Sequence, residues 1–214
     1  MLKKQTRGRT SQAKEKPLRR THKERRETTR RQLLEAAIEC VHELGYAAAT
    51  LSLIADRAGV TRGAVQHHFG ARNDLFLAIV TDISDKLFAQ SDMTSLRGKP
   101  LNECLARLTE QYWHVINSKH YIAAAQIMLG IAHDPKLSAQ VYKVIRKAEM
   151  RLDSLWVEFF ADQKLPAERV MAARHIVLAT YRGLTIRRIY RKEDVDWNAE
   201  RRLLLEMLER TFSY

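Results

Sequence analysis

The sequence predicts an all-α protein of about nine helices, and three observations support this fold class. Apolar residues recur at helical spacing from Leu33 almost to the end of the chain, and no stretch shows the alternation typical of strands. Pro100, Pro135 and Pro166 each stand where one helical pattern gives way to the next. The length of 214 residues allows one or two domains with a sizeable core.

The first predicted helix spans about residues 27–44. Its apolar positions follow a 3.6-residue period, and Gly45 ends the pattern. These positions are Leu33, Leu34, Ala37, Ile38, Val41 and Leu44. We expect this helix to support the segment that follows it.

Residues 51–69 predict two short helices that are separated by one tight turn. Gly59 gives the backbone the freedom to reverse direction, and Val60 fills the corner. Thr61 is a residue type that caps the first N–H groups of a helix. The second helix would expose side chains suited to base edges and phosphates, namely Arg62, Gln66 and His67, with the small Gly63 among them. An ordinary helical hairpin in a bundle is the alternative interpretation of this stretch alone.

A longer helix is predicted after this hairpin, with apolar groups at Leu75, Ile79, Ile83 and Leu87. From here the ordered residues resemble the N-terminal domain of the TetR family of bacterial transcriptional regulators over about residues 27–87. The residues that carry the resemblance are Gly45-Tyr46, Thr50, Ile54-Ala55, Gly59-Val60, Thr61-Arg62-Gly63, His68-Phe69, Arg72 and Asp74-Leu75.

The resemblance implies an N-terminal three-helix DNA-binding domain over residues 27–87, with a helix-turn-helix at about 50–69. A long helix would join it to a C-terminal helical domain, residues 88–214, that binds an effector and dimerises. Thr50, Thr61 and Arg72 would hold phosphates, while Arg62, Gly63, Gln66 and His67 would face the major groove. His68 and Phe69 would seat the second helix.

Two positions depart from the family pattern. Gln66 stands where the family usually has Tyr, so an amide that can pair with adenine replaces an aromatic phosphate contact. Ala71 stands where the fourth helix usually opens on Ser or Thr, which removes a cap worth about 1 kcal/mol. Asp74 would compensate in part through the helix dipole.

The net charge of +12 is concentrated at the N-terminus, where residues 1–32 hold thirteen Lys or Arg against three Glu. We expect residues 1–26 to form a disordered arm, because so basic a segment has little apolar surface to bury. The arm would track phosphates or enter a minor groove beside the reading helix. A solvated tail that aids solubility is the alternative.

Beyond residue 90, the patterns predict helices at about 101–118, 120–131, 136–162, 166–191 and 197–212. In the family, the equivalents of the last two helices form a four-helix bundle with a second copy. The apolar positions that would serve a homodimer here are Val170, Ala173, Ile176, Val177, Thr180, Leu184, Ile186, Leu203, Leu204, Met207, Leu208 and Phe212. The alternative is that these stripes face only their own core.

The middle helices carry bulky and polarisable side chains that could line a small-molecule site. The candidate effector-pocket residues are Trp113, His114, Tyr121, Met128, His133, Trp156 and Phe159. Aromatic and Met residues at this spacing also form plain core, which is the alternative for each of them.

Several classes of function find no support in the sequence. It has no Gly-rich phosphate loop, nucleophile elbow or paired catalytic carboxylates, so an enzyme is not expected. No His, Cys or acidic pair has metal-ligand spacing, and no cofactor is predicted. Cys40 and Cys104 are expected to be reduced thiols, with a redox switch as the alternative. No apolar run would span a membrane or form a signal segment, so we expect a cytoplasmic, nucleoid-associated protein.

Together these patterns predict a ligand-responsive dimeric repressor that binds double-stranded DNA at a palindromic operator. Two competing hypotheses remain. A DNA-bound adaptor would use its C-terminal domain to bind a partner protein and no small molecule. A nonspecific chromosome-coating protein would depend on the basic arm alone.

Overall fold

The computed structural model describes residues 21–90, 93–191 and 196–213, and helices are its only regular elements in these ranges. The long helices are α1 (His22–Leu44), α4 (Arg72–Gln90), α5 (Leu101–Ile116), α7 (Pro135–Phe159), α8 (Ala167–Arg191) and α9 (Asn198–Phe212). The short ones are α2 (Leu51–Ala58), α3 (Arg62–Phe69) and α6 (Lys119–Gly130), with single 3₁₀ turns at Thr94–Leu96 and Ala161–Gln163. The predicted fold class is therefore confirmed.

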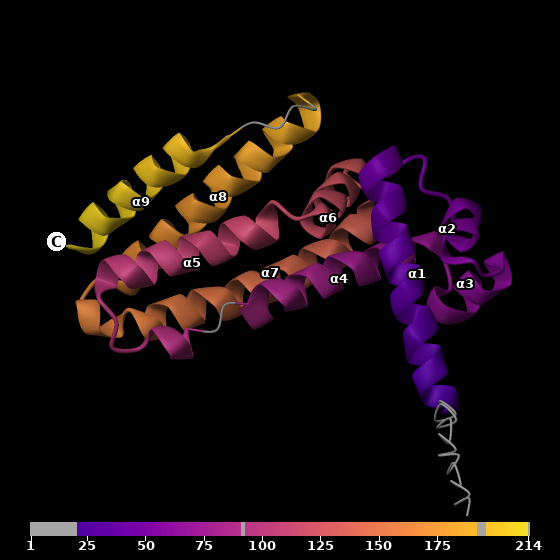
Figure 1. Cartoon of the computed structure of the whole chain (residues 1–214), viewed down its shortest axis with the longest axis horizontal. Coiled ribbons are helices and arrows are strands. Elements are labelled where there is room, and N and C mark those ends of the chain that lie inside the picture. Colours follow the sequence, from indigo (N-terminus) through magenta and orange to yellow (C-terminus); the bar gives the residue numbers. More distant parts are fainter. Residues whose placement is uncertain (1–20, 91–92, 192–195, 214) are drawn as a thin grey trace, which may run out of the picture.

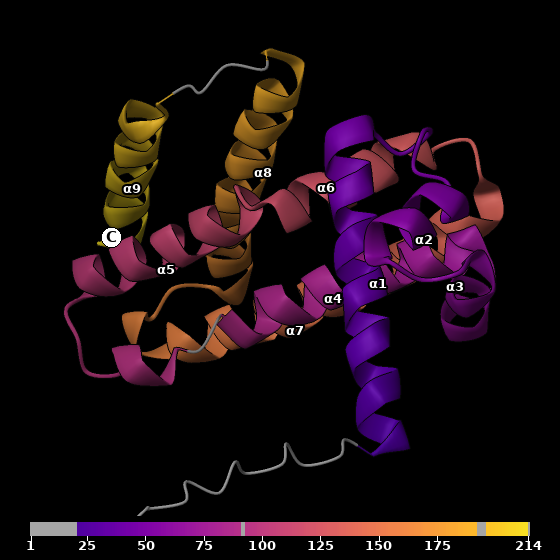
Figure 2. The same ribbon diagram turned by 45° about the vertical axis from the view of Figure 1, so that its right-hand side comes forward.

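The molecule is elongated, with α2 and α3 at one end and α9 at the other (Figure 1). Between them, α4 packs along α7, while α1 crosses their end and packs on α6 (Figures 1 and 2). Helix α5 packs on both α8 and α9. One continuous core of buried apolar side chains runs through these helices, from Leu33 and Ile38 in α1 to Phe212 in α9.

Helix α1 begins earlier than the sequence analysis predicted. Residues 22–26 were assigned to the arm, but they form the first turn of α1. Thr21 and Glu24 make a capping box, in which the Thr21 hydroxyl accepts from the Glu24 N–H at 3.2 Å. The Glu24 carboxylate in turn accepts from the Thr21 N–H at 2.8 Å. This reciprocal cap satisfies two N–H groups and fixes the helix start. The rest of the predicted arm, residues 1–20, lies outside the described residues.

The start of α4 shows how the missing cap at Ala71 is replaced. The Asp74 carboxylate accepts a hydrogen bond from the Ala71 N–H at 3.0 Å, which satisfies an N–H at the helix start. Asp74 also lies in the first turn, where a negative charge is favoured by the helix dipole. The compensation expected from Asp74 therefore includes a direct hydrogen bond.

Two polar contacts hold the C-terminal helices together. Arg174 in α8 is fully buried and pairs with Asp153 in α7 at 2.6 Å. Trp156 in α7 is also fully buried, and its indole N–H donates to the Tyr112 hydroxyl of α5 at 2.9 Å. These contacts fix α5, α7 and α8 relative to one another around the core.

Candidate nucleic-acid interface and ligand pocket

Helices α2 and α3 form a helix-turn-helix whose local geometry follows from a few residues. Gly59 adopts a left-handed conformation, with φ of 67°, which allows the chain to turn directly after α2. Thr61 caps α3, because its hydroxyl accepts from the Ala64 N–H at 3.2 Å. Ile54 and Val65 are fully buried between the two helices and the rest of the domain.

The side chains proposed to face the major groove are all on the surface. Arg62, Gly63, Gln66 and His67 are exposed, whereas Val65 and Phe69 on the opposite side of α3 are buried. In Figure 1 this helix lies at the end of the molecule, beyond α1. A short helix whose outer face carries amide, imidazole and guanidinium donors is suited to contact base edges.

Thr50 and Thr61 occupy equivalent positions at the starts of α2 and α3. Both are exposed, and each hydroxyl accepts from a backbone N–H of its own helix. Since a hydroxyl accepts and donates at once, each can still donate its proton to a phosphate oxygen. Each hydroxyl lies at the positive end of a helix dipole, which favours a nearby phosphate.

His68 and Phe69 seat α3, as the sequence analysis expected. Phe69 is 8% exposed, and the Arg30 guanidinium of α1 lies over its ring at 4.6 Å. His68 is half-buried, and burial lowers its pKa, with smaller contributions from His67 and from Arg26 and Arg30. Helix α1 therefore places two basic side chains beside α3, and Arg26 is there because the helix begins earlier than predicted. Sequence reasoning assigned Arg26 to the arm, although the Thr21–Glu24 capping pattern was visible.

Arg72, which is predicted to contact a phosphate, also makes contacts inside the domain. Its Nε donates to the Ala49 carbonyl at 3.0 Å, and a second nitrogen donates to the Tyr46 carbonyl. The guanidinium also lies over the rings of Tyr46 and Phe76, at 4.5 and 4.4 Å from their centres. Arg72 thus connects the start of α4 to the loop before α2 through hydrogen bonds to two carbonyls and contacts with two aromatic rings.

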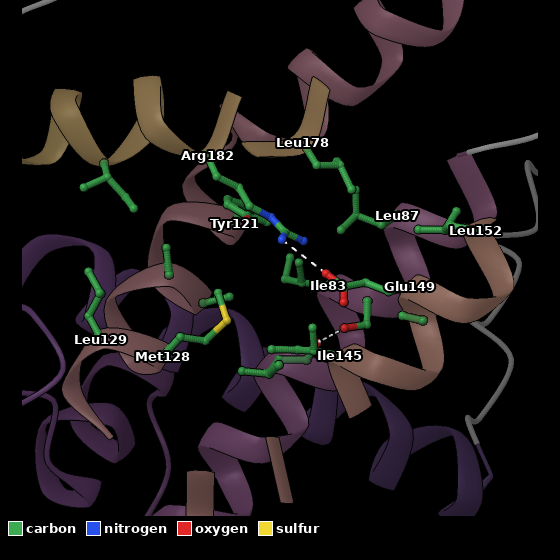
Figure 3. Close-up of a pocket in the computed structure, with 16 residues that line it drawn as sticks. Ile83, Leu87, Tyr121, Met128, Leu129, Ile145, Glu149, Leu152, Leu178 and Arg182 are labelled. Carbon is green, nitrogen blue, oxygen red and sulfur yellow. Dashed lines mark hydrogen bonds and ion pairs between the residues drawn. The ribbon is translucent and has the colours of Figure 1, made fainter. Parts of the chain in front are cut away.

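The second candidate site is a cavity of about 280 Å³ between α4, α6, α7 and α8. Most of its wall is aliphatic, with Ile83, Met128, Ile145 and Leu178 among the lining side chains (Figure 3). Its polar groups come from Ser84, Tyr121, Glu149 and Arg182. Figure 3 shows Arg182 reaching from α8 toward Glu149 on α7, and their charged atoms lie 3.2 Å apart.

Only two of the seven predicted pocket residues, Tyr121 and Met128, line this cavity. Trp156 is core, held by Tyr112, and Trp113 packs its ring against Tyr181 and Arg201. Phe159 lines a separate hollow near Leu96 and Cys104. His114 and His133 are exposed at other places on the surface.

Arg182 and Glu149, the charged groups of the cavity, were not among the residues predicted for the pocket. They are 33 residues apart and meet only because α7 and α8 pack together. The small residues Ala124 and Ala125 of α6 gave a weak signal, since side chains without bulk leave the space that a cavity needs. Most of the aromatic residues predicted for the pocket do not line this cavity, and Trp156 fills the core.

Other sites receive little support within the described ranges. No group of three or more His, Cys, Asp or Glu side chains that could hold a metal ion occurs in residues 21–90, 93–191 and 196–213. Cys40 and Cys104 are buried free thiols, and burial raises the pKa of each. A raised pKa disfavours the reactive thiolate. None of the described helices has an apolar stretch long enough to cross a membrane.

Comparisons with known proteins match both the N-terminal region and the whole chain. The family model for bacterial regulatory proteins of the TetR family matches residues 33–79. The HTH-type transcriptional regulator CymR of Pseudomonas putida is 21% identical over 197 residues, which cover 92% of this chain and 97% of CymR. The HTH-type transcriptional regulator BetI of Escherichia coli K12 is 29% identical over 163 residues, covering 74% and 80% of the two chains.

Solved structures share the fold at low sequence identity. The transcriptional regulator FadR from Bacillus subtilis, in complex with stearoyl-CoA, superposes with a TM-score of 0.66 at 19% identity. The match covers 83% of this chain and 96% of FadR. A transcriptional regulator from Rhodococcus sp. Rha1 has a TM-score of 0.63 at 23% identity, covering 86% and 94%. The helical arrangement of the C-terminal half is therefore shared as well as the helix-turn-helix.

Proposed function

We propose that the chain is a regulator of the TetR family that represses transcription as a homodimer and whose DNA binding responds to a small effector. It is a DNA-binding regulator and not an enzyme. The observation that carries the proposal is the exposed polar face of α3, which is positioned by the buried Val65 and Phe69 on its opposite face. We expect the protein to act at the nucleoid, where its DNA partner lies.

The proposed reading of DNA divides the exposed residues into two groups. Arg62 and Gln66 would read base edges, since Arg pairs with guanine and Gln with adenine in the major groove. His67 lies beside Gln66 on the exposed side, and Gly63 lets the backbone approach the groove. The hydroxyls of Thr50 and Thr61 would donate to phosphates and set the register of α3. Arg72 would add a phosphate contact through Nη1, because only its Nε and Nη2 donate to backbone carbonyls.

A homodimer is supported by the surface of α8 and α9. Ile176, Leu203 and Met207 are large apolar side chains, and each is more than half exposed. The two helices lie side by side at the end of the molecule opposite α2 and α3 (Figures 1 and 2). A dimer formed through this face would bury these side chains and place one α3 helix of each copy on the DNA. Two α3 helices about 34 Å apart would enter successive major grooves of a palindrome.

We propose that α6 carries the effector signal to the DNA-binding helices. Met128 and Leu129 line the cavity, and Gly130 at the end of the same helix lies against the Tyr46 ring. Tyr46 in turn stacks with Arg72, which bonds to the Ala49 carbonyl directly before Thr50. A ligand that displaces α6 would thereby move the start of α2. It acts only if it binds the two conformations with different affinity, by about 1–3 kcal/mol.

Footprinting on the DNA that flanks the gene for this protein tests the proposed function. Protection of a defined palindrome supports it, whereas uniform coverage would favour the nonspecific coating hypothesis. Arg62→Ala should weaken specific binding by about 1–3 kcal/mol and relax selectivity at one base pair. Arg146→Ala is the matched control, because Arg146 is exposed on α7, away from the DNA-binding helices.

The adaptor hypothesis makes a different prediction for the same chain. An adaptor would bind the palindrome but show no stabilisation by any small molecule in a broad thermal-shift screen. The cavity between α4, α6, α7 and α8 favours the effector hypothesis, because apolar chambers with a few polar groups are typical of ligand sites. Loss of ligand-induced stabilisation on narrowing the cavity, by Ala125→Leu, would support this assignment.

A further inference from the structure

The cavity between α4, α6, α7 and α8 also contains information about the chemistry of its ligand, and this inference rests on the proposed effector function. Its volume of about 280 Å³ lies just below the usual range of about 300–1,000 Å³ for small-molecule pockets. Aliphatic side chains come from all four helices, including Val80, Ala124, Leu152 and Ile186. A compact and mainly apolar molecule fits such a wall.

The charges on the cavity wall cancel. Arg182 donates from Nη1 to the Glu149 carboxylate at 3.2 Å, so the two form an ion pair on the wall. Burial alone would lower the pKa of Arg182, but Tyr121 and Glu149 together raise it, and the guanidinium stays charged. Burial raises the pKa of Tyr121, so its phenol stays neutral. The wall therefore has no net charge for a ligand ion to neutralise.

One donor on this wall lacks an acceptor. The Nε–H of Arg182 is shielded from solvent and has no hydrogen-bond partner, although Nη1 of the same guanidinium is paired. The Ser84 hydroxyl is already committed, since it donates to the Val80 carbonyl at 2.9 Å. Because less than 1 Å² of Nε is accessible, the Arg182 side chain has to rotate toward the cavity before a ligand acceptor can reach this N–H. A buried donor without a partner is unfavourable, so such a contact would be made with a gain.

We infer that the cavity binds a small, mainly apolar and uncharged molecule that offers one hydrogen-bond acceptor, such as a carbonyl oxygen, to the Nε–H of Arg182. A carboxylate ligand would add an uncompensated negative charge beside Glu149 in surroundings of low dielectric constant. An ammonium ligand would meet the Arg182 guanidinium with the same sign of charge. A neutral acceptor satisfies the unpaired donor and leaves the ion pair intact.

Three probes of similar size and different charge test the inference on the full chain. They are cyclohexyl methyl ketone, cyclohexanecarboxylate and cyclohexylmethylamine, each titrated in the millimolar range by ligand-observed NMR. We expect the ketone to bind more tightly than the other two. It should also compete with any effector found by screening, because both would occupy the same cavity.

Three variants connect this preference to the wall. Arg182→Met keeps most of the side-chain volume but removes the donor, and should weaken ketone binding about tenfold. Arg169→Met is the matched control on the exposed surface of α8 and should change it less than about twofold. Glu149→Gln removes the charge that neutralises Arg182. The affinity of cyclohexanecarboxylate should therefore rise, because Arg182 is left without a counter-charge, while the affinity of the ketone changes little. If the ion pair had a purely structural role, Glu149→Gln would not change the preference for the ketone over the carboxylate.

Each other result overturns the inference. Preferred binding of the carboxylate to the wild-type chain would assign an anionic ligand, and preferred binding of the amine a cationic one. Ketone binding that survives Arg182→Met would show that the Nε–H does not select the ligand. Failure of all three probes to bind a folded, operator-binding chain would remove the cavity as a site for this class of ligand, while leaving the proposed DNA-binding function standing.

Discussion

Replacing Gly130 by Ala should destabilise the contact between the C-terminal helices and the DNA-binding domain. Gly130 is the last residue of α6, and it lies against Tyr46 in the loop that precedes α2. A Cβ atom at this position would lie 2.3 Å from Cδ1 of Tyr46 and 2.6 Å from its Cγ. Neighbouring carbon atoms are normally about 3.5–4.0 Å apart, so the ring would have to retreat by more than about 1 Å.

Moving the Tyr46 ring would cost free energy, because two other side chains pack against it. It packs against Phe76, with ring centroids 5.0 Å apart, and the Arg72 guanidinium lies 4.5 Å from its centre. Overpacking of this kind typically costs about 1–3 kcal/mol. The helix preference of Ala over Gly would return about 0.5–1 kcal/mol. The middle values of these two ranges leave a net loss of about 1.3 kcal/mol in the free energy of unfolding.

Urea denaturation and operator binding of the same preparations measure the two consequences of Gly130→Ala. A cost of about 1.4 kcal/mol on the DNA-binding conformation would weaken operator binding about tenfold. The same substitution in a Tyr46→Ala background is the control, since the clash is then absent and the added Ala should be neutral or stabilising. The coupling energy between the two sites should therefore be at least about 1 kcal/mol.

Two results would refute this reasoning. Gly130→Ala with unchanged or higher stability and unchanged operator affinity would show that Tyr46 moves without cost. Equal effects of Gly130→Ala with and without the Tyr46 ring would show that the contact does not transmit the change.

The remaining predictions concern a buried ion pair, a histidine and the proposed dimer. Asp153→Asn leaves the fully buried Arg174 without its carboxylate, and should lower the free energy of unfolding, measured in urea, by about 3–5 kcal/mol. A loss of about 1 kcal/mol or less, as for a solvent-exposed ion pair, would contradict this prediction. Burial lowers the pKa of His42, so the unfolded chain binds a proton more readily and stability should fall as the pH drops through 6.5 toward the lower folded pKa. His42→Gln should reduce this pH dependence, and an unchanged slope would exclude His42 as its source. Met207→Asp should shift the protein to monomers in analytical ultracentrifugation and weaken operator binding, whereas a stable dimer would place the interface elsewhere.

The helix-turn-helix could be predicted in detail because its signals are local. Gly59 at the turn and the capping Thr61 act on backbone groups within a few residues, so the sequence alone identifies them. The start of α1 was also marked locally, by Thr21 and Glu24. It was missed because the basic composition of the segment was given more weight than the cap.

The role of Arg72 could not be read from its sequence neighbours. Its partners are the carbonyls of Tyr46 and Ala49, which lie more than twenty residues earlier and come close only when the loop folds against α4. A basic residue at a helix start is equally compatible with a phosphate contact. The folded position of the loop adds the structural role, and the phosphate contact of Arg72 stays a prediction.

The ligand pocket was the least predictable part for a physical reason. Cavities form where side chains are small or shaped so that they leave space, as at Ala124 and Ala125, and a sequence pattern does not display empty volume. Bulky residues were predicted to line the pocket instead, yet one of them, Trp156, is fully buried and fills the core. The pairing of Arg182 with Glu149 depends on the packing of α7 against α8.

The claim that α3 reads a base sequence is tested most directly by the affinity of the full chain for its operator and for every single-base variant of that operator. Comparing the wild type with Gln66→Ala, we predict that discrimination of about 1–3 kcal/mol disappears at one base pair of each half-site and persists at the others. A uniform loss across all operator variants, or no loss at all, would contradict the assignment of Gln66 to the major groove.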